Sequence, residues 1–293
     1  RLIILHNLYK NNSYGILYVV ATPIGNINDI TYRAVEVLSK VDLIATEDTR
    51  HSKKLLNFYG INTRQISYHK HNESKRSSYL IDFIMNGKNV ALVSDAGTPT
   101  ISDPGDTLIA LARKNNILVS PIPGACSVIS SLCVSGYGSR DFKFIGFLPK
   151  RESKKTDILS NHKNKDYSLI FLESPNRVID TLEVLKKIYT GDSNLIIARE
   201  ITKIYEDINM LKIDDWLSYY ELNNNEKLKG EFVFIIPKIE NYENDIEYRE
   251  IEDFIKLLLK NNISYNAAVK ITCMHYDIKK NAIYNKYINL AKK

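Results

Sequence analysis

The fold of this chain is decided by one stretch of sequence, SDAGTPTISDPG at residues 94–105. The apolar run at residues 90–93 predicts a buried strand before it, and helical spacing of apolar residues predicts a helix after it. The stretch is therefore a loop at the carboxyl end of a strand, where open α/β sheets bind ligands. Gly97 and Gly105 can adopt positive φ or let a ligand approach the backbone closely.

The end of the stretch is typical of a helix start. Asp103 is expected to be the N-cap, with Pro104 at the first helical position. The nine residues before Asp103 are too many and too polar for a simple connection. They are therefore expected to have a binding role.

The first half of the chain alternates apolar runs with amphipathic segments. Strands are predicted at residues 16–21, 43–46, 65–68, 90–93 and 118–119. Helices predicted between them make a mostly parallel sheet the expected arrangement. Polar residues follow strand after strand, which predicts a site built from several loops. Neither a G-x-G-x-x-G nor a P-loop motif is present in the sequence, so an ordinary dinucleotide or P-loop site is disfavoured.

A second unit begins near Asp141 and again contains strands. They are predicted at residues 142–147, 168–172, 195–198, 208–213 and 232–236. The basic run from Lys150 to Lys165 is expected to be a loop that suits a phosphate backbone, although such runs are often solvated surface. From Asn241 the chain changes character, and three short amphipathic helices are expected between Ile251 and Lys293.

Composition bounds the class of protein. The chain has 293 residues, 44% apolar and 25% charged, as in globular proteins. The formal charge of +6 fits a polyanionic partner without requiring one. Three cysteines without C-x-x-C spacing predict reduced thiols and a cytoplasmic location. No apolar run reaches the ~20 residues that would cross a bilayer, so no membrane contact is expected.

His69 and His71 are the one pair that suggests a metal. Lys70 lies between them and no third ligand is close in sequence. A substrate-facing loop is therefore expected there rather than a metal site.

These motifs resemble those of the ribosomal RNA small subunit methyltransferase I family. The resemblance covers roughly residues 15–237 and includes six motifs besides the opening one. They are TPIGN (22–26), EDTR (47–50), PIPGACS (121–127), ESPNR (173–177), REITK (199–203) and KGE (229–231).

The resemblance implies a fold and a function. The fold would be α/β, with two α/β domains of the tetrapyrrole methylase type at residues 15–123 and 124–240. A poorly ordered extension (1–14) would precede them and a small helical appendage (241–293) would follow. The protein would use S-adenosylmethionine to methylate a cytidine 2′-hydroxyl in the decoding region of 16S rRNA, within the small ribosomal subunit. The family also suggests a homodimer.

Site residues follow from the matching motifs. Residues expected to bind the cofactor are Pro23, Gly25, Ser94, Asp95, Ala96, Gly97, Thr98, Pro99, Ile101, Ser102, Pro123, Gly124 and Ala125. Carboxylates and a lysine that could assist a weakly acidic hydroxyl are Asp48, Asp103, Glu173, Glu200 and Lys203. Residues expected to bind RNA are Arg50, Lys150, Arg151, Lys154, Lys155, Arg177 and Arg199.

Two alternatives stay open at this point. One is a methylase of the same fold that acts on a small tetrapyrrole-like acceptor. The other is a non-catalytic RNA-binding protein that uses the basic run and the C-terminal helices. Both methylases would bind S-adenosylmethionine, whereas only the rRNA enzyme and the RNA-binding protein would bind RNA.

Overall fold

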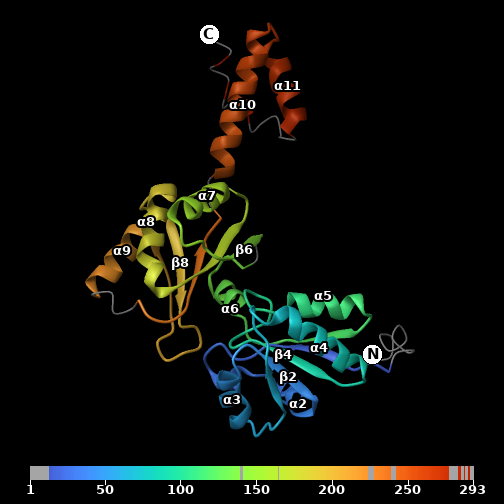
Figure 1. Ribbon diagram of the computed structural model, residues 1–293. Helices are drawn as coiled ribbons and strands as arrows, with labels where there is room; N and C mark the ends of the chain where they lie inside the picture. Colours follow the sequence, from blue (N-terminus) through green and yellow to red (C-terminus); the bar gives the residue numbers. More distant parts are fainter. Residues whose placement is uncertain are drawn as a thin grey trace. The chain divides into compact units, whose positions relative to one another are not determined.

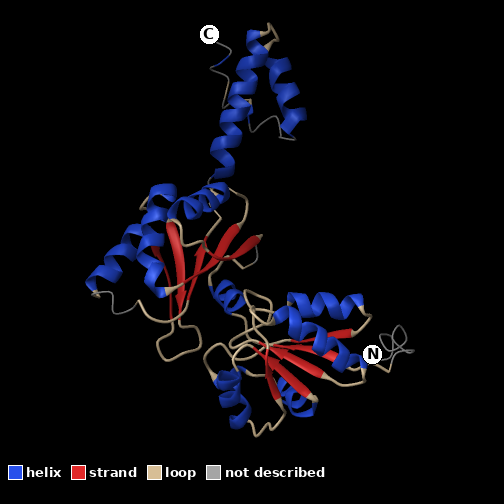
Figure 2. Cartoon of the chain, viewed as in Figure 1, coloured by secondary structure: helices blue, strands red, loops and turns tan. Residues whose placement is uncertain are grey.

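The computed structural model describes residues 13–138, 141–163, 165–223, 228–238 and 242–276, with positions 283, 284, 287 and 290. Most of the expected extension at residues 1–14 lies outside these residues. The chain divides into two compact units, Arg1–Pro237 and Lys238–Lys293 (Figure 1). The first unit holds both sheets and the second is helical (Figure 2).

The first sheet is parallel throughout, in the order β3-β2-β4-β1-β5. Its strands are β1 (Ile16–Val20), β2 (Leu43–Thr46), β3 (Gln65–Ser67), β4 (Val90–Val93) and β5 (Leu118–Ile122). All residues of β2 and β4 are buried, as expected for a parallel sheet covered on both faces. The prediction of a mostly parallel α/β sheet is confirmed.

Helices cover both faces of this sheet. They are α2 (Tyr32–Lys40), α3 (Thr49–Phe58), α4 (Glu73–Met85) and α5 (Asp106–Lys114), with the 3-10 helix η1 (Ile27–Asp29) before α2. Leucines of α4 and α5 pack with Leu17 and Leu92 on one side. Residues of α2 and α3 pack with Val20 and Ile44 on the other.

The second sheet is mixed, in the order β6-β7-β10-β8-β9. Its strands are β6 (Phe142–Phe147), β7 (Ser168–Glu173), β8 (Asn194–Arg199), β9 (Asp207–Lys212) and β10 (Phe232–Ile236). Only β6 and β7 pair in parallel, whereas β10 and β9 run antiparallel to their neighbours.

This sheet also packs against helices on two faces. The helices are α6 (Ser127–Val134), α7 (Glu152–His162), α8 (Val178–Tyr189) and α9 (Ile213–Leu222), with η2 (Pro175–Arg177) leading into α8. Trp216 of α9 and Leu185 of α8 belong to one core. Val128 and Leu132 of α6 belong to the core on the other face, which also takes in Ile24 from the loop after β1. Ile24 therefore joins the loops of the first sheet to the second sheet.

Two predictions about local structure are wrong. The basic run from Lys150 to Lys165 is not a loop, because α7 occupies its centre and buries Leu159 in the core. Asp103 is not an N-cap, because α5 starts at Asp106 and Gly105, with φ of +145°, is the N-cap residue. Strand and helix ends elsewhere differ from the prediction by a few residues.

The second unit contains α10 (Tyr242–Lys260) and α11 (Tyr265–Tyr276). Ile251, Ile255 and Val269 form its core with Ile283 and Tyr287. The first expected helix is longer than predicted, and the third falls largely outside the described residues. Of the helices described, none is long and apolar enough to cross a membrane.

Candidate active site

The loop after β4, residues 94–105, is tied to the loop after β1. Thr22 and Gly97 exchange two backbone hydrogen bonds of 2.9 and 3.0 Å. Gly97 has φ of +84°, as the sequence predicted. Thr100 and Ser102 also have positive φ, +73° and +91°, which is uncommon for residues other than glycine. Such backbone strain gathers at functional sites, where the surrounding structure holds it in place.

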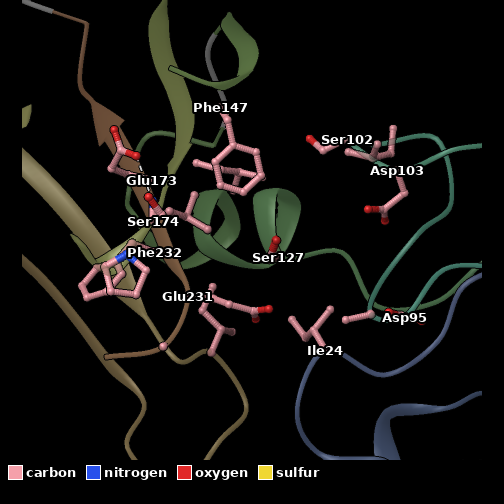
Figure 3. A pocket seen from close by; sticks show the side chains of 17 residues that line it. Ile24, Asp95, Ser102, Asp103, Ser127, Phe147, Glu173, Ser174, Glu231 and Phe232 are labelled. Carbon is pink, nitrogen blue, oxygen red and sulfur yellow. Dashed lines mark hydrogen bonds between the residues drawn. The ribbon is translucent and has the colours of Figure 1, made fainter. Parts of the chain in front are cut away.

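A cavity of about 320 Å³ lies between this loop and the strand ends of the second sheet (Figure 3). Ser102 and Asp103 line it from the loop after β4. Phe147, Ser174 and Glu231 line it from the second sheet. Loops of both sheets therefore build one site, as the sequence predicted.

A second cavity of about 330 Å³ adjoins the first. Pro23 and Gly25 line it from the loop after β1, and Ser94 lines it from the loop after β4. Four residues line both cavities, namely Ile24, Asp95, Ala96 and Glu231. Molecules held in the two cavities would meet at these four residues.

An open ion cluster borders the second cavity, and we define it as Glu200, Lys203 and Glu231. The ammonium of Lys203 lies 2.8 Å from Glu200 Oε1 and 3.1 Å from Glu231 Oε2. Burial would raise the pKa of Glu200, but hydrogen bonds from Lys203 and from the Glu231 backbone lower it overall. The carboxylate of Glu200 is therefore occupied in holding Lys203 and Glu231, while Lys203 and Glu231 line cavities.

Carboxylates gather around the first cavity. Burial raises the pKa of Glu47, and the charges of Asp103 and Asp95 raise it further. Burial likewise raises the pKa of Asp103, with a further contribution from Asp95. Lys70 opposes both shifts. Negative charge is therefore costly in this region, and a cationic ligand would relieve that cost.

A buried ion cluster lies beside the first cavity, and we define it as Lys155, Glu173 and Arg177. Glu173 Oε1 lies 2.5 Å from Arg177 Nη2, and Glu173 Oε2 lies 4.0 Å from Lys155 Nζ. Thr181 links Lys155 to Glu173, because its hydroxyl accepts a hydrogen bond from Lys155 at 2.7 Å and donates one to Glu173 at 2.8 Å.

The buried cluster corrects three predicted roles. Lys155 is 3% exposed, so the prediction that it binds RNA is wrong. Arg177 turns inward to Glu173 and the Leu148 carbonyl rather than outward to RNA. Glu173 lines the first cavity, but both of its oxygens are held by these partners, which is a poor state for a general base.

The remaining predicted residues lie at the surface or behind the cavities. Asp48 caps α3, and hydrogen bonds from Arg50 hold the pKa of its carboxyl well below the usual range, so it is a weak base. Arg199 donates to the Lys229 carbonyl at 2.9 Å. Exposed cations that keep their predicted surface position are Arg50, Lys150, Arg151 and Lys154.

The predicted cofactor residues divide into two groups. Those that line a cavity are Pro23, Gly25, Ser94, Asp95, Ala96, Ile101 and Ser102. Those that line neither cavity are Gly97, Thr98, Pro99, Pro123, Gly124 and Ala125. Thr98 supports the loop, because its hydroxyl donates to the Ala125 carbonyl at 3.0 Å.

Sequence reasoning missed several lining residues. Glu231 belongs to the KGE motif (229–231), but the sequence does not predict it as a site residue. Ser127 and Phe147, which also line the first cavity, are likewise not predicted. For Glu231 the signal was its place directly before an apolar strand. His69 and His71 lie in the turn before α4 with ring centroids 5.9 Å apart. Within the described ranges, no group of three His, Cys, Asp or Glu residues could hold a metal ion.

Comparisons with known proteins show the family of this chain. A family model described as Tetrapyrrole (Corrin/Porphyrin) Methylases matches residues 16–215. Ribosomal RNA small subunit methyltransferase I of Haemophilus influenzae is 43% identical over 276 residues, which cover 92% of this chain and 95% of that protein. The protein of the same name from Halalkalibacterium halodurans is 39% identical over 95% of this chain and 96% of its own length.

Solved structures give the fold alone. Cobalt precorrin-4 methyltransferase, a cobalamin biosynthetic enzyme, has a TM-score of 0.54 at 16% identity and covers 75% of this chain and 94% of its own. Uroporphyrin-III-C-methyltransferase from Thermus thermophilus has a TM-score of 0.52 at 16% identity. The match covers 79% of this chain and 98% of that chain. This chain belongs to the tetrapyrrole methylases and, within them, to the ribosomal RNA small subunit methyltransferase I family.

Proposed function

We propose that the protein transfers a methyl group from S-adenosylmethionine to the 2′-hydroxyl of a cytidine in the decoding region of 16S rRNA. It would act on the small ribosomal subunit, in the cytoplasm and as a homodimer. The observation that carries the proposal is 43% identity over nearly the whole length of a ribosomal RNA small subunit methyltransferase I. Two adjoining cavities, which together give room for a methyl donor and an acceptor, support it.

The residues around the cavities fit S-adenosylmethionine. This cofactor carries two positive groups, a sulfonium and an α-ammonium, and it supplies an electrophilic methyl group. Asp95 and Asp103 line the first cavity, and burial among carboxylates raises the pKa of Asp103. A cation in that cavity would stabilise these carboxylates in their charged form. The loop at residues 94–103 and the loop at residues 22–26 would hold the cofactor.

A variant of Gly97 tests the cofactor loop. A Cβ at Gly97 would lie 3.2 Å from Ile24 Cγ2, and φ of +84° disfavours a β-branched residue. Gly97→Val should therefore abolish S-adenosylmethionine binding in a calorimetric titration. Gly60→Val is the matched control, because Gly60 also has positive φ but a Cβ there meets nothing within 4 Å. Unchanged affinity in a folded Gly97→Val protein would contradict this placement of the loop.

The RNA would meet exposed cations near the start of α7. Lys150 and Arg151 precede the helix and Lys154 lies in its first turn, all exposed. Cations of this kind bind phosphates and release counterions, so binding should weaken with salt. Arg50 offers a further exposed guanidinium at the start of α3, although it is paired with Asp48.

The function is tested with small ribosomal subunits that lack the modification. We expect labelled methyl groups from S-adenosylmethionine to enter 16S rRNA and to make one backbone linkage resistant to alkaline cleavage, because alkaline cleavage needs a free 2′-hydroxyl. Label that enters a tetrapyrrole but not the subunit would contradict the proposal and favour the small-acceptor alternative. Binding of RNA without any transfer would favour the non-catalytic alternative.

A further inference from the structure

Glu231 occupies the place where the two cavities meet. Of the four residues that line both, only Asp95 and Glu231 carry an ionisable side chain. Asp95 Oδ1 is committed to the backbone N–H of Asp48 at 3.0 Å. The side chain of Glu231 is 65% exposed, and its carboxylate points into the cavity (Figure 3). Glu231 is therefore the more available of the two carboxylates.

The backbone of Glu231 is fixed on both sides. Glu200 N–H donates to the Glu231 carbonyl at 3.0 Å, and Glu231 N–H donates to Glu200 Oε1 at 3.0 Å. Gly230 has φ of +96°, and a Cβ there would lie 2.2 Å from the carboxylate of Glu200. A group held in this way keeps its position without reorganisation, which favours catalysis.

The carboxylate of Glu231 shares its cation with Glu200. Lys203 is shared between two carboxylates, those of Glu200 and Glu231. The open cluster therefore carries one negative charge in excess. Among the residues that the structure describes, Lys203 alone engages the Glu231 carboxylate, at Oε2, so Oε1 remains available to an acceptor.

We propose that Glu231 is the general base of the reaction, an inference that rests on the methyl transfer proposed above. As the bond forms between the ribose oxygen and the methyl carbon, the methyl–sulfur bond breaks and its electron pair stays on sulfur. The proton of the 2′-hydroxyl passes to a carboxylate oxygen of Glu231. Because the side chain is open to solvent, it returns that proton to water before the next cycle.

The other carboxylates fit this role less well. Glu173 is held by Arg177 and Thr181 in the buried cluster. Glu200 lies behind the cavities and positions Glu231 and Lys203. Asp103 lines the first cavity but not the second, and its carboxyl is more buried than that of Glu231, which raises its pKa.

Glu231→Gln tests the assignment. A glutamine oxygen can still accept from Lys203, so the variant keeps the geometry and removes the basic group. We expect the single-turnover rate on saturating small subunits and S-adenosylmethionine to fall at least ~100-fold, the usual scale of general acid–base assistance. Glu36→Gln is the matched control, because Glu36 is exposed on α2 and pairs with Lys40.

Calorimetry provides a readout independent of turnover. S-adenosylmethionine should bind Glu231→Gln within a few-fold of its wild-type affinity. A variant rate within a few-fold of wild type would overturn the assignment, and so would a variant that no longer binds the cofactor, since Glu231 would then hold the donor. Absence of transfer by the wild-type protein would instead contradict the proposed function, so the two failures are distinguishable.

Discussion

Two ion clusters lie at strand ends of the second sheet, yet their surroundings differ. The buried cluster is centred on Glu173, the last residue of β7, and its side chains are 3%, 0% and 18% exposed for Lys155, Glu173 and Arg177. The open cluster involves the residues after β8 and before β10. Its side chains are 16%, 30% and 65% exposed for Glu200, Lys203 and Glu231.

The difference shows that the residue types of a charged motif at a strand end do not determine whether the motif stabilises the fold or takes part in chemistry. In the buried cluster each charge depends on its partners, because water cannot solvate it. In the open cluster a carboxylate can exchange its partner for a substrate or for water. The first arrangement holds the fold beside the cavity, whereas the second can take part in chemistry.

Glu173→Gln should give the largest effect on stability. It removes the negative charge between Lys155 and Arg177, whose side chains are only 3% and 18% exposed. Loss of one partner of a buried ion pair costs about 3–5 kcal/mol, so the free energy of unfolding in urea should fall by that amount. A loss below about 1 kcal/mol would mean that the cluster does not hold the fold.

Gly230→Ala should damage the open cluster with a smaller loss of stability. The added Cβ would lie 2.2 Å from Glu200 Oε1, which must move and release Glu231 or Lys203. We expect a fall of about 10- to 100-fold in the single-turnover rate, which reaches only the lower end of general acid–base assistance because Glu231 itself is still present. Gly60→Ala controls for positive φ, since a Cβ at Gly60 meets nothing within 4 Å. Equal rates for the two variants would show that Gly230 does not position the cluster.

The exposed cations at the start of α7 predict how RNA binding depends on salt. Replacing Lys150, Arg151 and Lys154 by Ala should lower the slope of log affinity against log salt by ~2 to 3 units if all three contact phosphates. Lys155 is left in place because it is buried. Filter binding of small subunits over a range of salt measures the slope. An unchanged slope would place the RNA elsewhere on the protein.

Asp103→Asn should give the smallest of these effects, a change in stability that depends on pH. The folded pKa of Asp103 is raised from its ordinary value of 3.8 by burial and by neighbouring carboxylates. Its stabilising contribution is present below the unfolded pKa and is lost as pH rises through the folded pKa. The variant should therefore gain melting temperature relative to wild type as the pH rises above the ordinary pKa of 3.8. A difference independent of pH would contradict the raised pKa.

Sequence patterns predicted the sheet well because its signals are local. The runs at residues 43–46 and 90–93 are apolar throughout and are buried throughout in the structure. Gly97 and Gly105 have positive φ, as their residue type allowed. The fold class therefore followed from short stretches of sequence.

The roles of charged residues depended on contacts that sequence does not reveal. Lys155 appeared to belong to a solvated basic run, but its partners Glu173 and Thr181 come from other elements. Glu200 and Glu231 are separated by about thirty residues and meet only through pairing of β8 with β10. Which of them faces the cavity could not be read from either motif alone.

The central claim is that the open cluster performs chemistry at the meeting point of the cavities while the buried cluster holds the fold. It is tested most directly by measuring the single-turnover rate and the free energy of unfolding for Glu231→Gln alongside the wild-type protein. We expect a rate at least ~100-fold lower and a free energy of unfolding within about 1 kcal/mol of wild type. A Glu231→Gln protein that transfers the methyl group at the wild-type rate would contradict the claim, even if its stability were unchanged.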